Sequence, residues 1–156
     1  MARIDHYHEP GAPKPNSMVP AVTAVVANEA GEILLQRRAD NGLWALPGGA
    51  VELGESAGQS VVREVKEETG LDVEPTGIVG VYSDPHHLIE FSDGEVRQQF
   101  SVCFTARLVG GAPATSDEST AVRFVAPAEL DDLAMHPAQR LRIRHFLECR
   151  PAPFFS

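Results

Sequence analysis

The segment Arg63–Gly70, with the sequence REVKEETG, contains three glutamates in a short run: Glu64, Glu67 and Glu68. If the run is helical, Glu64 lies three residues from Glu67 and four from Glu68, so the three side chains share one face, where like charges repel each other. Clustered carboxylate oxygens are also ligands that Mg²⁺ and Mn²⁺ prefer, together with carbonyl groups and water. Two interpretations follow: a metal site whose cation relieves the repulsion, or the solvated acidic face of a surface helix.

A helix over residues 56–69 is predicted to hold these glutamates. Ser56 and Gln59 match the S-x-x-Q capping box that opens helices, and Gly70 supplies a common helix stop. At roughly 100° per residue, the glutamates occupy one arc of this helix. The neighbouring arc is apolar and consists of Val61, Val62 and Val65. We therefore expect the helix to bury its valines against a sheet and to present its carboxylates at the edge of that contact.

A longer pattern surrounds the acidic helix. Residues 49–71 fit G-x5-E-x7-R-E-U-x-E-E-x-G-U, in which U is a bulky aliphatic residue, at every fixed position. This segment, GAVELGESAGQSVVREVKEETGL, resembles the Nudix box. The resemblance covers roughly residues 19–147, with EILLQRRADNGLWALPGG before the box and SDESTAVRFVAPAEL after it. It implies an α/β fold, the Nudix-type α/β/α sandwich with a mixed β-sheet.

The resemblance implies roles for residues at matching motif positions. The metal ligands would be Glu64, Glu67, Glu68 and the carbonyl group of Gly48. Arg63, which also lies i,i+4 from Glu67, would orient the glutamates. Glu55 would support the loop before the helix or bind a second metal. The implied cofactor is Mg²⁺, with Mn²⁺ as the alternative.

The general base is left open between two positions. It would be a box glutamate, Glu67 or Glu68, or a glutamate on a later loop. Glu118, in TSDEST, is the loop candidate, and the alternative is that it is an ordinary surface acid. The sequence has no GxxxxGK[ST] loop to hold phosphates. Bound Mg²⁺ would therefore neutralise the phosphate charge and lower the pKa of a coordinated water molecule.

The reaction implied by the resemblance is hydrolysis of a nucleoside diphosphate linked to another moiety. Pro85, about fifteen residues beyond Gly70, favours ADP-ribose or a similar nucleoside-diphosphate sugar, although an ordinary turn would also place a proline there. Nucleoside triphosphates are the next class, followed by dinucleoside polyphosphates. The alternative is a Nudix-fold module that binds nucleotides without hydrolysing them, but such modules usually lose box glutamates that this chain retains.

Three further residues are candidates for binding the substrate. Arg37 and Arg38 end a predicted strand, where they could meet phosphates or lie in solvent on opposite sides of the strand. Trp44 could stack on a base or pack in the core. His86 and His87 are expected to be exposed in a hairpin.

Composition and charge exclude several classes of function. The 156 residues suit one domain with a single core. A net charge of −9 argues against binding of nucleic acid or of an anionic membrane surface, because both need a basic face. It does not exclude a small phosphorylated ligand, since a bound cation reverses the local potential. No apolar run is long enough to span a membrane, and the N-terminus has no apolar signal core, so we expect a cytoplasmic protein.

Three segments are expected along the chain. Residues 1–18, which hold three prolines, are predicted to form an extended arm. Residues 19–150 form the Nudix domain, and residues 151–156 a tail. The oligomeric state is left open, and the arm could cross to a partner in a homodimer.

The elements between these bounds follow from apolar patterns. Strand-like runs begin at VPAVTAVVA and continue to AVRFV, with a hairpin turn at Asp93-Gly94. Pro127 is expected to open a short helix and Pro137 a last one. The apolar face of that last helix consists of Ile143, Phe146 and Leu147. Cys103 and Cys149 are expected to be buried or inert thiols.

Overall fold

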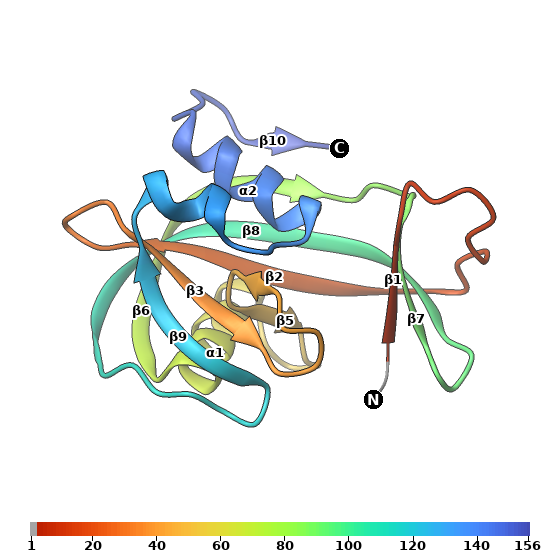
Figure 1. Ribbon diagram of the computed structural model, residues 1–156, viewed down its shortest axis with the longest axis horizontal. Coiled ribbons are helices and arrows are strands. Elements are labelled where there is room, and N and C mark those ends of the chain that lie inside the picture. The colour runs from red at the N-terminus through yellow and green to blue at the C-terminus, as the bar shows by residue number, and fades with distance from the viewer. Residues whose placement is uncertain (1–2) are drawn as a thin grey trace.

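The computed structural model describes residues 3–156, which form one mixed sheet with helices on both faces (Figure 1). The strands are β1 (Arg3–Tyr7), β2 (Ser17–Ala27), β3 (Ile33–Arg38), β4 (Trp44–Ala45), β5 (Gly48–Ala50), β6 (Leu71–Tyr82), β7 (His87–Phe91), β8 (Val96–Gly111), β9 (Ser119–Val125) and β10 (Phe154–Phe155). The helices are α1 (Ala57–Thr69), the 3₁₀ helix η1 (Pro127–Asp132) and α2 (Pro137–Leu147). None of the helices in residues 3–156 combines the length and the apolar character needed to cross a membrane.

Strand β2 lies at the centre of the sheet. It runs parallel to β8 over its whole length, from Ser17 opposite Arg97 to Ala27 opposite Arg107. The main strand order is β1-β7-β8-β2-β3-β4, while β6 pairs with β8 and β9 with β3. Parallel and antiparallel neighbours thus occur in one sheet, and the predicted α/β fold with a mixed sheet is confirmed.

Side chains of the central strands alternate between two apolar layers, one on each face of the sheet. In the first layer, Val61 and Val65 of α1 are fully buried and pack in a cluster that includes Leu34. In the second layer, Ile143 of α2 belongs to a cluster that includes Leu35. Each layer fixes one helix against the sheet, which gives the α/β/α arrangement seen in Figure 1.

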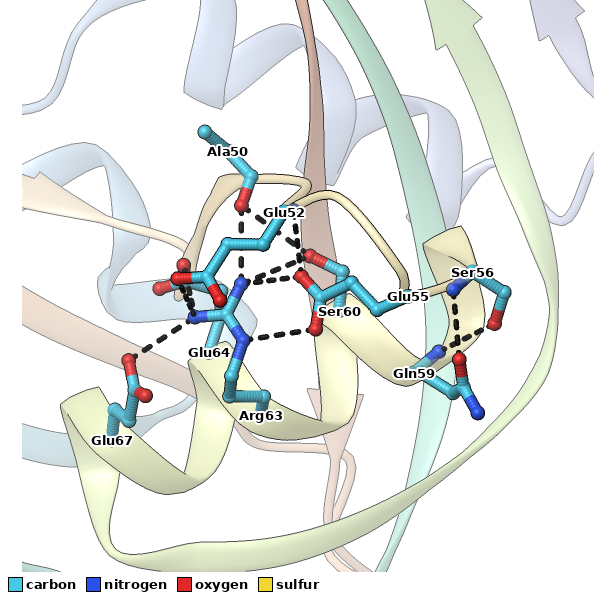
Figure 2. Close-up of polar contacts among 9 residues, drawn as sticks. All are labelled: Ala50, Glu52, Glu55, Ser56, Gln59, Ser60, Arg63, Glu64 and Glu67. Carbon is cyan, nitrogen blue, oxygen red and sulfur yellow. Dashed lines mark hydrogen bonds and ion pairs between the residues drawn. The ribbon is translucent and has the colours of Figure 1, made fainter.

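The helix predicted from the acidic segment is confirmed, including both ends. The Ser56 hydroxyl accepts a hydrogen bond from the backbone N–H of Gln59 at 3.1 Å, and the Gln59 side chain accepts one from the backbone N–H of Ser56 at 2.8 Å (Figure 2). Gly70 ends the helix with a φ of 77°, in the left-handed region that favours glycine. These caps set where α1 begins and ends, and therefore which side chains it turns away from the sheet.

Each end of the described chain contains a short strand, within the segments expected to be an extended arm and a tail. Residues 3–7 form β1, which pairs antiparallel with β7 of its own chain (Figure 1). At the other end, β10 pairs parallel with β6. Neither strand was predicted, because pairing between segments far apart in the chain leaves no periodic signal in strands this short. Residues 1–2 of the expected arm lie outside the described residues.

The last helix turns most of its predicted apolar face to the sheet, because Phe146 packs against the apolar cluster that contains Ile143. Ile143 is buried as expected, but Leu147 is 43% exposed. Arg142 and His145 are buried instead, because they face Tyr82 of β6, whose hydroxyl lies 2.9 Å from the Nδ1 atom of His145. The helix therefore offers polar as well as apolar side chains to the sheet.

The two cysteines lie in different surroundings. Cys103 is buried in β8, as expected, whereas Cys149 is exposed just beyond α2. Cys149 has a φ of 49°, a left-handed conformation in the turn that follows the helix.

Candidate active site

Helix α1 places the three box glutamates at different depths. Glu68 is buried with 4% of its surface exposed, Glu64 is partly buried and Glu67 lies in solvent. The Glu68 carboxyl group accepts a hydrogen bond from the side-chain nitrogen of Gln36 on β3, and the backbone nitrogen of Gly48 on β5 lies 3.4 Å from it. Two strands therefore hold the inner end of the acidic face.

Arg63 connects the loop before α1 with this acidic face (Figure 2). Its guanidinium donates to both carboxylate oxygens of Glu55, at 2.6 and 3.0 Å. It also donates to Glu64 at 2.9 Å, to Glu67 at 3.3 Å and to the carbonyl oxygen of Ala50 at 3.2 Å. These contacts fit the orienting role expected for Arg63, because one planar group ties two glutamates of the helix to the loop.

Glu55 supports the loop in this arrangement. Besides its two bonds with Arg63, it accepts a hydrogen bond from the backbone N–H of Glu52 at 2.8 Å. The hydrogen bond with Arg63 is the main reason that the pKa of Glu55 is lowered to about 2. Glu55 does not line the cleft that the other box glutamates share. These contacts support the expected role of Glu55 in holding the loop rather than its alternative role in binding a second metal.

Two features relieve the repulsion between the glutamates without a metal. Arg63 neutralises the outer side of the cluster. Burial raises the pKa of Glu68 to about 9, and a hydrogen bond with the neighbouring Glu64 adds to the rise. Glu68 is therefore protonated at neutral pH, and it must lose this proton before it can ligate a cation.

The oxygen atoms of this cluster fit a hard divalent cation. Within residues 3–156, no three His, Cys, Asp or Glu side chains already converge on one point. Glu67 can complete such a set, however, because it lies in solvent on the same face as Glu64. Gly49 leaves the space that this requires, since an added Cβ there would lie 2.6 Å from the Glu64 carboxylate. Carboxylate oxygens of this kind suit Mg²⁺ and Mn²⁺ better than they suit softer metals.

These side chains line an open hollow of about 750 Å³, which we call the acidic cleft. Its acidic residues are Asp40, Glu52, Glu64, Glu67, Glu68, Asp117 and Glu118. Its basic residues are Arg3, Arg38 and Arg63. Glu118, the loop candidate for the general base, therefore faces the same space as Glu68.

A second cavity of about 130 Å³, the inner cavity, adjoins the acidic cleft. Both hollows are lined by Arg3, Gln36, Arg38, Gly48 and Gly49. The inner cavity has aromatic walls: Trp44 lines it, and the rings of His87 and His136 stack there with centroids 5.0 Å apart and planes at 14°. Burial lowers the pKa of His87 to about 4 and lowers that of His136, so we expect both rings to be uncharged at neutral pH.

The prediction that His87 is exposed in a hairpin is wrong. The ring of Tyr7 on β1 lies 5.3 Å from the ring of His87 and 5.2 Å from that of His136, both in edge-on contact. The strand formed by the N-terminal residues therefore covers His87, whereas His86 in the same turn is exposed.

The three residues expected to bind substrate lie in different surroundings. Arg38 lines both hollows. Trp44 is half-buried between the core and the inner cavity, and the guanidinium of Arg123 lies 5.1 Å from its ring centroid. Arg37 donates to the carbonyl oxygen of Gly42 at 3.0 Å and lines neither hollow. The fold thus brings Arg38 and Trp44, but not Arg37, to the candidate site.

Sequence reasoning missed much of the inner cavity. Its unpredicted polar residues include Arg3, Thr23, Gln36, Ser101 and Arg142. The sole available signal was a polar residue inside an apolar strand, such as Gln36 in EILLQRR or Ser101 in FSVCF. Such a signal does not tell which strands meet, so it could not locate a cavity.

Comparison with known proteins supports the resemblance to the Nudix family. A family model for the NUDIX domain matches residues 18–146. A MutT-like protein of Streptomyces ambofaciens is 41% identical over 112 residues, covering 72% of this chain and 66% of that protein. An ADP-ribose pyrophosphatase of Methanocaldococcus jannaschii is 36% identical over 118 residues, covering 73% and 65%. The chain thus spans just under two thirds of the length of these two relatives.

A solved structure shows the same fold. The crystal structure of an ADP-ribose pyrophosphatase from Streptococcus suis superposes with a TM-score of 0.66 and 29% identity, covering 88% of this chain and 96% of that one. The family match extends from β2 to the end of α2 and includes the whole acidic helix. The chain therefore belongs to the Nudix family.

Proposed function

We propose that this protein hydrolyses a phosphoanhydride bond in a nucleoside diphosphate linked to another moiety, with Mg²⁺ or Mn²⁺ as cofactor. The observation that carries the proposal is that Glu64, Glu67 and Glu68 share one cleft, and that this cleft adjoins a partly aromatic cavity. A substrate with a charged diphosphate at one end and a planar base at the other needs these two environments side by side.

The residues of the chain divide the work between them. The cation would be held by Glu64, Glu67, Glu68 and the carbonyl group of Gly48. When bound, it neutralises phosphate charge and lowers the pKa of a coordinated water molecule. Arg38, where the two hollows meet, donates to phosphate oxygens, and Arg63 keeps the carboxylates in place. Once charge and position are provided, little covalent chemistry remains for the protein.

Removal of a proton from the attacking water falls to a carboxylate that faces the acidic cleft. Glu118 is our candidate on the loop before β9, where its backbone N–H donates to the Ser116 hydroxyl at 3.2 Å. It lines the same acidic cleft as Glu64, Glu67 and Glu68. A box glutamate, Glu67 or Glu68, is the alternative base. The variant Glu118→Gln distinguishes the two assignments. If Glu118 is the base, this replacement should lower kcat by about 100-fold or more, whereas it should have a much smaller effect if a box glutamate is the base.

ADP-ribose or another nucleoside-diphosphate sugar is the favoured substrate, and nucleoside triphosphates come next. The relative from Methanocaldococcus jannaschii and the structure from Streptococcus suis are both ADP-ribose pyrophosphatases by name, which supports this order. Pro85 adds no support, because it lies between β6 and β7 and lines neither the acidic cleft nor the inner cavity.

The test is a substrate panel assayed with Mg²⁺ and again with EDTA. ADP-ribose, UDP-glucose, dGTP and diadenosine tetraphosphate represent the four classes, and both products are identified to show which bond is cut. We expect turnover that stops with EDTA and that falls at least about 100-fold in Glu68→Gln. Glu74→Gln is the matched control, since Glu74 is an exposed glutamate paired with Arg107 at 2.6 Å. Tight binding without turnover would instead favour a nucleotide-sensing module.

A further inference from the structure

Five buried polar atoms within residues 3–156 have no hydrogen-bond partner in the protein. They are Arg3 Nε, Thr23 Oγ1, Gln36 Oε1, Ser101 Oγ and Arg142 Nε. All five residues line the inner cavity. Buried polar atoms are nearly always paired, because leaving one unpaired costs stability. Their concentration around one cavity indicates that the cavity is built to receive a polar ligand.

Arg142 is a buried cation in the wall of the inner cavity, and its Nε atom has no hydrogen-bond acceptor in the protein. It is 4% exposed, and its guanidinium donates to the carbonyl oxygen of Ala138 at 2.7 Å. The same group lies over the ring of Tyr82, 4.4 Å from the centroid. These contacts hold the guanidinium in place but do not include a carboxylate. A buried cation with so little compensation is costly unless a ligand supplies acceptor atoms.

Some of the unpaired atoms donate hydrogen bonds and others accept them, and this pattern limits the chemical classes of ligand that could pair with all of them. The amide nitrogen of Gln36 is bonded to Glu68, so its oxygen is left as an acceptor. Arg142 Nε can only donate, and the Ser101 hydroxyl can do either. A phosphate group offers only acceptors and cannot satisfy Gln36. The edge of a nucleobase offers donors and acceptors side by side, and its plane suits a cavity walled by Trp44 and by stacked imidazole rings.

We infer that the inner cavity binds the base of the nucleotide, and that Gln36, Ser101 and Arg142 read its edge. Arg3, from strand β1, completes the wall between the base and the diphosphate. This inference rests on the proposed function and goes beyond it by naming the residues that set specificity. It also gives a role to β1, which lies outside the family match over residues 18–146.

The test compares ligands with and without a base. Isothermal titration with Mg²⁺ gives the dissociation constants of ADP, GDP, CDP, UDP and inorganic pyrophosphate. We expect at least one nucleoside diphosphate to bind about tenfold or more tightly than pyrophosphate. Ser101→Ala should weaken that nucleotide about tenfold and leave pyrophosphate binding unchanged, because only the base reaches Ser101. Arg3→Gln should also weaken the nucleotide.

Thermal stability provides a second readout. Ser101→Ala removes an unpaired buried hydroxyl, so its Tm should equal or exceed that of the wild type, whereas loss of a structural hydrogen bond would lower it. Thr105→Val is the matched control on the same strand, since the Thr105 hydroxyl is paired with Thr76 at 2.9 Å away from the cavity. Its nucleotide affinity should stay unchanged.

Three results would overturn the inference. One is that pyrophosphate binds as tightly as every nucleoside diphosphate. Another is unchanged nucleotide affinity in Ser101→Ala. The third is an equal loss for nucleotide and pyrophosphate, which would mean that the acidic cleft had been disturbed. The substrate panel judges the proposed hydrolysis separately, so the two can fail independently.

Discussion

Glu68 decides the chemistry of the site at the scale of single residues. It is buried against two strands, its pKa is raised to about 9, and it is hydrogen-bonded with Glu64. A surface glutamate would bind a cation with little change in protonation. In the proposed metal site, Glu68 would instead exchange a proton for the cation, which would couple metal binding to pH.

We predict that the metal-free protein loses stability as pH rises. In the folded protein Glu68 keeps its proton up to about pH 9, whereas in the unfolded chain it loses that proton near its ordinary pKa of 4.5. Between these values the folded state binds more protons, so the free energy of unfolding falls with increasing pH. Urea unfolding at pH 5.5, 7 and 8.5 in EDTA measures this slope, and Glu68→Gln should reduce it. An equal slope in both proteins would contradict the raised pKa.

Two adjacent glycines should respond differently to an added methyl group. In Gly48→Ala the new Cβ would lie 2.1 Å from the backbone oxygen of Val22, and a backbone atom in a central strand cannot move away cheaply. In Gly49→Ala it would meet the carboxylate of Glu64, which can rotate. We therefore expect Gly48→Ala to lower Tm strongly. Gly49→Ala should keep Tm but weaken Mn²⁺ binding at least about tenfold.

Thermal scans and Mn²⁺ titrations of the two glycine variants measure these effects. An unchanged Mn²⁺ affinity in Gly49→Ala would show that metal binding does not depend on the present position of the Glu64 carboxylate.

Sequence spacing alone predicts which site residues are neighbours only within the box. Glu64, Glu67, Glu68 and Arg63 lie on one helix, so their spacing alone fixes which of them are neighbours. Ser101 and Arg142 could not be predicted, because they come from a strand and a helix whose approach depends on the whole sheet.

At the scale of elements, α1 works as a rigid mount for the carboxylates. Its caps fix its ends, and Val61 and Val65 fix its inner face against the sheet. Both features are local and were predictable from the sequence. Strands β1 and β10 were not, because each consists of a few residues whose partners lie far along the chain.

Packing of α1 should therefore control metal binding as well as stability. Val65→Ala removes two buried methyl groups from a residue with no exposed surface, which should cost about 2 kcal/mol of unfolding free energy. It should also weaken Mn²⁺ binding, because the helix can shift. Val109→Ala, at a residue that is 52% exposed, is the control and should change neither quantity measurably. Full Mn²⁺ affinity in Val65→Ala would show that the carboxylates do not depend on this packing.

At the scale of the whole molecule, helices cover both faces of the sheet (Figure 1). The acidic cleft is lined by residues of α1 and of strands β3 and β5. The alternating pattern of the strands and the Nudix box predicted this sandwich. The inner cavity was beyond prediction, because it is enclosed by β1, β3, β8 and α2 together. The net charge of −9 also belongs to this scale, and a bound cation would reverse the local potential near a phosphorylated ligand.

Divalent metal should stabilise the folded protein as a whole. A cation that binds only the folded state raises stability by about 2.7 kcal/mol at a concentration 100 times its dissociation constant. We expect Tm to rise with Mn²⁺ concentration at pH 8, and the rise should disappear in Glu64→Gln but persist in Glu74→Gln. A Tm that does not depend on Mn²⁺ would contradict a metal site built by the fold.

The most direct test is anomalous diffraction from crystals grown with Mn²⁺ and a nucleoside diphosphate. We predict a manganese peak within coordinating distance of Glu64, Glu67 and Glu68, with the diphosphate of the nucleotide beside it. No peak there, or a peak bound by other residues while these carboxylates still contact only Arg63 and one another, would contradict the central claim.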